Sequence, residues 1–162
     1  MRTRLIGLAL AGLGLAVGPN LAARAEILGD YLGYRACQEC HAEIVASWQK
    51  TPHAHAFAGL KRQGEEKQGI PGCVRCHVVA FEQDGGFIDM GLTPELADVQ
   101  CEACHGPGKK HVEAGGDGQI VAKPDANSCR VCHTEGQDKN FDYQRKSKLV
   151  HDLAKGGKKG AK

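Results

Sequence analysis

Cys37-Gln38-Glu39-Cys40-His41 is the first of four copies of one short motif, Cys-x-x-Cys-His, along this chain. The other copies are Cys73-Val74-Arg75-Cys76-His77, Cys101-Glu102-Ala103-Cys104-His105 and Cys129-Arg130-Val131-Cys132-His133, so together they use all eight cysteines. Two cysteines three positions apart lie on the same side of one helical turn, and the next residue can turn its side chain toward the same point. The spacing predicts four helical turns that each present two sulfurs and one imidazole to a common ligand.

Covalent haem attachment explains all three positions of this motif, which we call a clamp. The two thiols can form thioethers with two vinyl groups of one porphyrin, and the histidine then ligates the iron. Zinc ribbons and thioredoxin-like redox pairs also use Cys-x-x-Cys, but neither explains a histidine after every pair. We therefore expect four haem c groups, bound covalently by Cys37, Cys40, Cys73, Cys76, Cys101, Cys104, Cys129 and Cys132, with the proximal ligands His41, His77, His105 and His133.

The remaining four histidines equal the number of distal positions on four haems. His53 shares a face of a predicted helix with Phe57 and Leu60, and an imidazole on such an apolar stripe is buried against something, here porphyrin. His55 points to roughly the opposite side, so it is a weaker candidate. The candidate distal ligands are therefore His53, His111 and His151, with His55 as a further candidate.

The position of His111 in the sequence excludes one haem as its binding partner. It follows the third clamp too closely to reach the far face of the same haem, so we expect it to ligate another one, as His151 can do at a distance. Met90 is the only methionine after the expected leader, and we expect it to pack in a hairpin rather than to ligate iron. Bis-histidine ligation should then dominate, which gives low-spin iron at comparatively low potential.

The first 25 residues have the pattern of a secretory signal peptide. A basic start, Met1-Arg2-Thr3-Arg4, precedes an apolar stretch over 5–17 and an Ala23-Arg24-Ala25 cleavage signal, so Glu26 should begin the mature chain. An uncleaved membrane anchor is the alternative, but the apolar run falls short of the ~20 residues that span a bilayer. We expect a periplasmic protein with no membrane-spanning segment in the mature chain, in the kind of compartment where spare thiols would be oxidised.

Charge gives little indication of a binding partner. Without the three arginines of residues 1–25, 18 basic residues stand against 19 acidic ones, which does not support nucleic-acid binding. The lysines concentrate at Lys109-Lys110 and in residues 155–162, where glycines accompany them. We predict a haem domain over 26–154 and a basic flexible tail over 155–162, with docking of the tail to an acidic partner as the alternative.

The expected fold is mainly α, with short helices, long loops and one short β-hairpin packed around four haems. A chain with one tryptophan, three tyrosines, four phenylalanines and 22 glycines cannot build a large conventional core, so the haems must supply it. Helices are predicted over 42–49 and from Pro52 to about Gln63, with Thr51 as N-cap and Gly64 as the end. A polar loop follows over 64–72. The hairpin is predicted over 78–90, around Asp84-Gly85-Gly86, and a last helix near Asn140 should carry His151.

Four features together resemble the cytochrome c-554 family. They are Trp48-x-x-Thr51-x-His53-Ala54, the predicted hairpin after the second clamp, the Gly106-Pro107-Gly108 that follows the third clamp and precedes His111, and a terminal His151. The resemblance covers essentially residues 35–153. It implies a mostly helical periplasmic tetrahaem electron carrier whose haems pack in closely spaced pairs. It also implies that His111 ligates the first haem, His151 the third and His53 the fourth, which leaves the second without a distal protein ligand.

Two classes of function follow from these observations. The first, which we favour, is an electron carrier between periplasmic redox proteins, a donor and an acceptor, because almost the whole chain is used to hold haems. The second is a redox enzyme that converts a small molecule such as a nitrogen oxide or hydroxylamine at an open second haem. No catalytic residues are predicted, and a haem-based sensor is disfavoured because the chain has no output domain.

Overall fold

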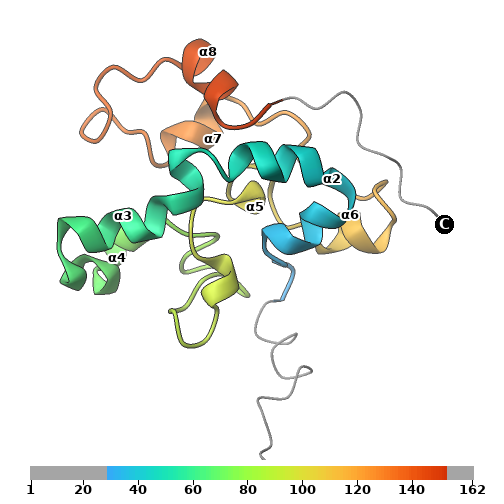
Figure 1. Ribbon diagram of the computed structural model, residues 1–162, viewed down its shortest axis with the longest axis horizontal. Helices are drawn as coiled ribbons and strands as arrows, with labels where there is room; N and C mark the ends of the chain where they lie inside the picture. Colours follow the sequence, from blue (N-terminus) through green and yellow to red (C-terminus); the bar gives the residue numbers. More distant parts are fainter. Residues whose placement is uncertain (1–28, 153–162) are drawn as a thin grey trace, which may run out of the picture.

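The computed structural model describes residues 29–152 (Figure 1). The predicted signal peptide and basic tail therefore lie outside the described residues. In the described range the chain is helical and contains no β-strand, which confirms the mainly α class. The helices are α2 (Tyr34–Trp48), η1 (Pro52–His55), α3 (Ala56–Gln63), η2 (Glu65–Gly69), α4 (Pro71–Val74), η3 (Pro94–Leu96), α5 (Cys101–His105), α6 (Lys109–Glu113), α7 (Ala126–Arg130), α8 (Tyr143–Lys146) and η4 (Ser147–Leu149).

The long helix α2 crosses the middle of the molecule, and the shorter helices are arranged around it (Figure 1). Helix α5 packs against α2, while α3 and α4 lie side by side on one flank and α7 and α8 form the upper part of the view. Over residues 29–152 no helix combines the length and the apolar character needed to cross a bilayer.

The structure confirms the second predicted helix, and its ends lie at the residues that predicted them. Pro52 occupies the first position of η1, where its missing N–H costs nothing, and Thr51 stands at the N-cap in an extended conformation. The chain continues directly into α3, which ends at Gly64 with φ 136°, a value that favours glycine. Thr51-Pro52 and Gly64 therefore mark the start and the end of the helical segment that carries His53.

Two small apolar clusters form the protein part of the core. The larger one surrounds the second clamp, where Cys73 packs against it, and contains Tyr31, Phe57, Leu60, Val74, Val78, Val79, Phe87, Leu96 and Ala97. The smaller one joins Val45, Trp48 and Ala54 beside Cys37 of the first clamp. Both clusters therefore form next to positions where haem is expected.

Other large apolar side chains are exposed, and several stand beside a clamp or a candidate ligand. Val131, 64% exposed, lies within the fourth clamp. Val112 directly follows His111, and Val121 and Leu149 are exposed near His105 and His151 respectively. Porphyrin rings placed at the clamps would cover apolar surface of this kind, which fits the expectation that haem completes the core.

The segment 78–90 does not form the predicted hairpin. Ala80 and Glu82 have φ of 52° and 62°, so the chain leaves the extended conformation that a strand requires. What remains is a turn-rich loop in which the backbone N–H of Phe87 donates to the carbonyl of Val79 at 2.9 Å. One isolated antiparallel bridge joins Val78 to Ala97, farther along the chain.

Three smaller expectations also differ from the structure. Met90, expected to pack in the hairpin, is 51% exposed. The region 64–72, predicted as a loop, contains η2 and the start of α4, because the acidic Glu65 and Glu66 stand in the first turn of η2 and Pro71 begins α4. The last helix begins at Tyr143, capped by Asp142, and ends before His151, which lies in the loop that follows η4.

Candidate haem-binding site

Each clamp lies on a helical turn, as the spacing predicts. The first is within α2, which is kinked at His41 (φ −121°, ψ 40°), and the third is the whole of α5. In the fourth, the backbone N–H of His133 donates to the carbonyl of Cys129 at 2.9 Å. Asp125 caps the helix that begins this clamp, because its carboxylate accepts from Asn127 N and Ser128 N. The backbone thus presents the two sulfurs and the imidazole of a clamp on one turn.

Each clamp keeps both of its cysteines available to a ligand. All eight lie in the described range and none forms a disulfide. Burial raises the pKa of Cys104 to about 11 and, together with Cys76, that of Cys132 to about 12. In the described part of the chain no three His, Cys, Asp or Glu side chains gather as a metal-ion site.

The clamps are neighbours in space in a definite order. A hydrogen bond with Cys101, and then burial, raise the pKa of Cys37, so the first clamp touches the third. A hydrogen bond likewise joins Cys76 to Cys132, which brings the second clamp to the fourth. Cys129 acts on the pKa of Cys104, so the third and fourth clamps are also close. The order in space is therefore first, third, fourth, second.

Three of the four clamp histidines each lie near the ring of another histidine. The ring centroids of His41 and His111 are 6.4 Å apart with planes at 14°, and those of His105 and His151 are 6.3 Å apart at 32°. The His53 and His133 rings are 6.0 Å apart at 56°. An imidazole nitrogen lies about 2.0 Å from a metal that it binds and roughly 1.2 Å from the centre of its own ring. Two imidazoles on opposite sides of one metal therefore have ring centres about 6.4 Å apart. The spacing of all three pairs fits one iron atom between the rings.

His77 and His55 behave differently. No imidazole among the described residues is paired with His77, whose Nδ1 donates to the carbonyl of Ala56 at 2.6 Å. His55 is exposed, and its Nε2 is 3.1 Å from the carbonyl of Gln49. The other candidate distal ligands have no hydrogen bond at Nε2 within residues 29–152. His55 therefore contacts a backbone carbonyl, and no ring contact joins it to His77 among the described residues.

Hydrogen bonds at Nδ1 select the tautomer of the clamp histidines. His105 donates from Nδ1 to the carbonyl of Val121 at 2.6 Å, and a carbonyl can only accept, so the proton lies on Nδ1 and Nε2 keeps its lone pair. His133 instead donates to the carboxylate of Asp138 at 2.8 Å. The Nδ1 of His41 is buried and has no hydrogen-bond partner among the described residues. Bonds of this kind orient an imidazole for metal ligation.

Burial also keeps two of these imidazoles uncharged. It lowers the pKa of His53, assisted by the nearby His133, and it is the largest cause of the lowered pKa of His105. Because a protonated imidazole cannot ligate iron, a lowered pKa leaves both rings ready to bind at neutral pH.

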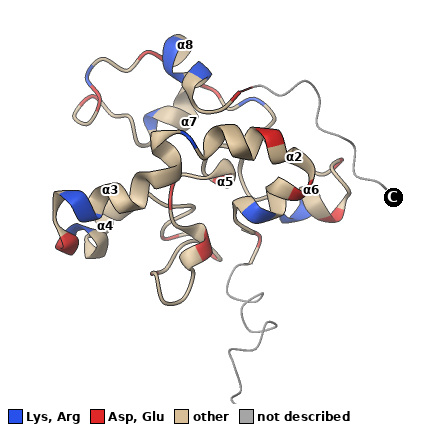
Figure 2. Cartoon of the chain, in the orientation of Figure 1, with Lys and Arg blue, Asp and Glu red and all other residues tan. Residues whose placement is uncertain are grey.

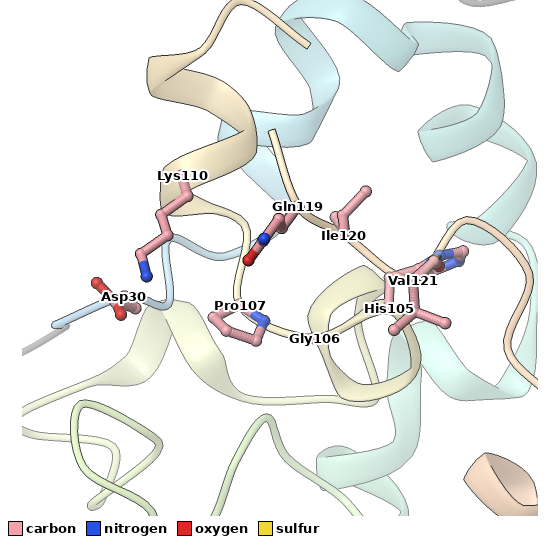
Figure 3. Close-up of a pocket in the computed structure, with 8 residues that line it drawn as sticks. All are labelled: Asp30, His105, Gly106, Pro107, Lys110, Gln119, Ile120 and Val121. Carbon is pink, nitrogen blue, oxygen red and sulfur yellow. Dashed lines mark hydrogen bonds between the residues drawn. The ribbon is translucent and has the colours of Figure 1, made fainter. Parts of the chain in front are cut away.

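The third clamp borders a cavity of about 470 Å³ (Figure 3). Pro107, Ile120 and Val121 provide apolar wall beside His105, while the side chains of Asp30 and Lys110 point toward one another at the other end. The cavity thus offers apolar walls next to a clamp and a charged opening.

Sequence reasoning missed the role of Glu102, which lies inside the third clamp and is 3% exposed. Its carboxylate accepts hydrogen bonds from the backbone N–H groups of Leu32, Gly33 and Gly108, at 2.7 to 3.1 Å. The carboxylate ties the entry of α2 to the third clamp. The sequence feature that could have indicated this role is an acidic residue between two cysteines, followed by Gly106-Pro107-Gly108.

The segment just before the third clamp holds His53 in place. The backbone N–H of Val99 donates to the carbonyl of His53 at 3.1 Å, and the carbonyl of Val99 accepts from Trp48 Nε1 at 3.0 Å. Gln100 Oε1 accepts from the backbone N–H of Tyr34 at 2.6 Å. The Trp48 and His53 of the sequence pattern are therefore fixed by one short connection.

Four Cys-x-x-Cys-His clamps, three of which have a second imidazole beside the clamp histidine, are the pattern of a multihaem c-type cytochrome. A profile of the family described as cytochrome c554 and c-prime matches residues 36–106. Cytochrome c-554 of Nitrosomonas europaea is 32% identical over 96% of this chain and 71% of that protein. This chain belongs to the cytochrome c-554 family, and it is a haem c protein of electron transfer whose partners are redox proteins.

Two further comparisons show similarity of fold or of a part of the chain. The solved structure of reduced cytochrome c554 from Nitrosomonas europaea matches with a TM-score of 0.57, over 75% of this chain and 83% of that one, at 24% identity, which shows a shared fold. The multihaem cytochrome MtrA of Shewanella baltica is 30% identical over 42% of this chain, but the match covers 24% of that protein.

Proposed function

We propose that this protein is a periplasmic tetrahaem electron carrier that uses three bis-histidine haems and one haem with an open distal position. The observation that carries the proposal is the set of three imidazole pairs with centroids 6.0 to 6.4 Å apart, each joining a clamp histidine to a histidine far away in the sequence. Iron is a one-electron redox centre when haem is bound. The chain's part is to supply ligands, spacing and local charge.

The proposed ligand sets follow from these pairs. His41 and His111 would hold the first iron, His105 and His151 the third, and His133 and His53 the fourth. His77 would hold the second without a protein ligand opposite. Because bis-histidine sites lack the Met ligand that raises potential in other cytochromes c, these haems should have comparatively low potentials.

The order of the clamps in space supports a path for electrons. Contacts between cysteines link the first clamp to the third, the third to the fourth and the fourth to the second. We infer that electrons pass along the haems in this order, with the first and second at the two ends. Figure 2 shows basic residues on α3, α6, α7 and α8 with acidic residues between them, so the described helices offer charges of both signs to a redox partner.

Haem loading tests the cofactor part of the proposal. Protein matured in a periplasm should have the mass of the chain from Glu26 plus four haems after denaturation, because thioether bonds survive unfolding. Intact-mass spectrometry measures this directly. Fewer than four haems in fully matured protein, or free thiols together with zinc, would contradict it.

A small-molecule redox enzyme is a second candidate, favoured by one observation. Nothing among the described histidine rings pairs with His77, and His55 is held by the carbonyl of Gln49 instead. An open position on the second iron would admit a small ligand such as nitric oxide or hydroxylamine.

Stopped-flow reoxidation separates the two candidates. We expect the reduced protein to be reoxidised rapidly by an oxidised periplasmic redox protein and slowly by nitrite, nitric oxide, hydroxylamine or peroxide. Catalytic reoxidation of all four haems by one of these molecules would favour the enzyme. A His77→Ala variant in which the small-molecule reaction is lost would assign it to the second haem.

A further inference from the structure

The fourth clamp differs from the other three in what its histidine bonds to. His77 and His105 donate from Nδ1 to neutral backbone carbonyls, and His41 Nδ1 has no hydrogen-bond partner in the described chain. His133 alone among them donates to a carboxylate, Asp138 Oδ2, at 2.8 Å. A negative charge therefore stands directly behind one proximal ligand.

A turn places this carboxylate. The backbone N–H of Asp138 donates to the carbonyl of Thr134 at 2.7 Å, so the chain folds back immediately after the clamp and returns the side chain to the His133 ring. The Asp138 side chain is 19% exposed and that of His133 is 32% exposed, so water only partly screens their interaction. The pair forms within one local turn and needs no distant element.

A cation and an aromatic ring complete the arrangement. The Lys146 ammonium on α8 contacts the same Oδ2 of Asp138, and it holds the pKa of that carboxyl below its usual value, with His133 as the next cause. The Phe141 ring stacks on His133 with centroids 4.9 Å apart, and the charges of Arg130 and Lys146 lie 5.7 and 5.8 Å from the Phe141 ring centre. The Asp138 carboxylate is thus held in place between the His133 ring and a cation.

We propose that Asp138 is a positioning residue that lowers the reduction potential of the fourth haem, and that Lys146 limits this effect. The inference rests on the proposed ligation of the fourth iron by His133. A carboxylate that accepts the Nδ1 hydrogen bond increases electron donation from Nε2, which stabilises the oxidised iron. Lys146 competes for the same oxygen and offsets part of its charge. The fourth haem therefore receives a tuning element that the other clamps lack.

Two substitutions test the proposal because they should shift one potential in opposite directions. Asp138→Asn keeps the size of the side chain but removes its charge, so the potential of the fourth haem should rise. Lys146→Met leaves the carboxylate unopposed, so the same potential should fall. Glu135→Gln is the matched control, since it removes an equal charge two residues from His133 and should shift the fourth potential less than Asp138→Asn. The potentials are measured by spectroelectrochemical titration of the holoprotein.

The fourth haem is assigned as the one whose EPR signal changes in His53→Ala. Opposite shifts of this haem, with four haems by mass and unchanged spin states, support the inference. An unshifted potential in Asp138→Asn, or a rise in both variants, overturns it while the electron carrier stands. Wild-type protein with fewer than four haems, or a His53→Ala spectrum identical to that of wild type, overturns the proposed ligation and this inference together.

Discussion

Replacing Glu102 by alanine is expected to lower the free energy of unfolding of the holoprotein by about 3–5 kcal/mol. The carboxylate is buried and accepts from three backbone N–H groups, those of Leu32, Gly33 and Gly108. Its removal leaves these donors without their partner; those of Gly33 and Gly108 are buried, and each unsatisfied buried donor costs about 1–3 kcal/mol. Urea unfolding followed by the Soret band and by circular dichroism measures the loss.

Two further variants separate the hydrogen bonds from the deletion itself. Glu102→Gln keeps the size and one carbonyl oxygen but turns an NH₂ group toward the backbone donors, so it should lose less stability than alanine. The exposed Glu113→Ala should change stability by no more than about 0.5 kcal/mol. A Glu102→Ala protein as stable as Glu113→Ala would show that the four hydrogen bonds contribute little.

Removal of any one paired distal histidine should convert one low-spin haem to high-spin. In His53→Ala, His111→Ala and His151→Ala, one iron loses the imidazole opposite its clamp, and alanine offers no ligand. Since the second haem is expected to be high-spin already, each variant should raise the high-spin content from one haem to two. EPR and optical spectra of the oxidised protein report this content.

His55→Ala is the matched control for these three variants. His55 has the same side chain and lies two residues from His53, but it is exposed and bonded to the carbonyl of Gln49. We expect its spectrum to equal that of the wild type. A new high-spin signal from His55→Ala would instead make it the ligand of the second iron, and unchanged spectra from the other three would remove the proposed pairs.

The parts of the structure that could be predicted from the sequence are those with local signals. The clamp turns follow from a three-residue spacing, and the helix that carries His53 follows from Thr51-Pro52 and Gly64. The hairpin failed because Asp84-Gly85-Gly86 is a turn signal that says nothing about the backbone at Ala80, where positive φ breaks the strand. Local patterns cannot report the conformation of residues whose constraints come from distant contacts.

The candidate site divides in the same way. Spacing alone predicts the eight cysteines and the clamp histidines. The partner of each clamp histidine was predicted from the family resemblance, because spacing does not show which distant histidine lies next to it in space. Glu102 escaped notice because its partners at Leu32 and Gly33 are separated from it by 70 and 69 positions. Asp138 lies only five residues from His133, yet an acidic residue in a loop is ordinarily solvated and gives no sign of its bond.

The proposed histidine pairs also make each iron a cross-link between distant parts of the chain. The loops closed by His41 and His111, by His53 and His133, and by His105 and His151 overlap along the sequence. Cross-links that close loops of this length remove entropy from the unfolded chain worth roughly 4 kcal/mol each in the simplest treatment. Because the loops overlap, each proposed iron holds a segment that lies inside another of the loops. With haem bound in this way, a chain with little apolar core would unfold as a single unit, and its short helices would gain a cooperativity that their own lengths could not supply.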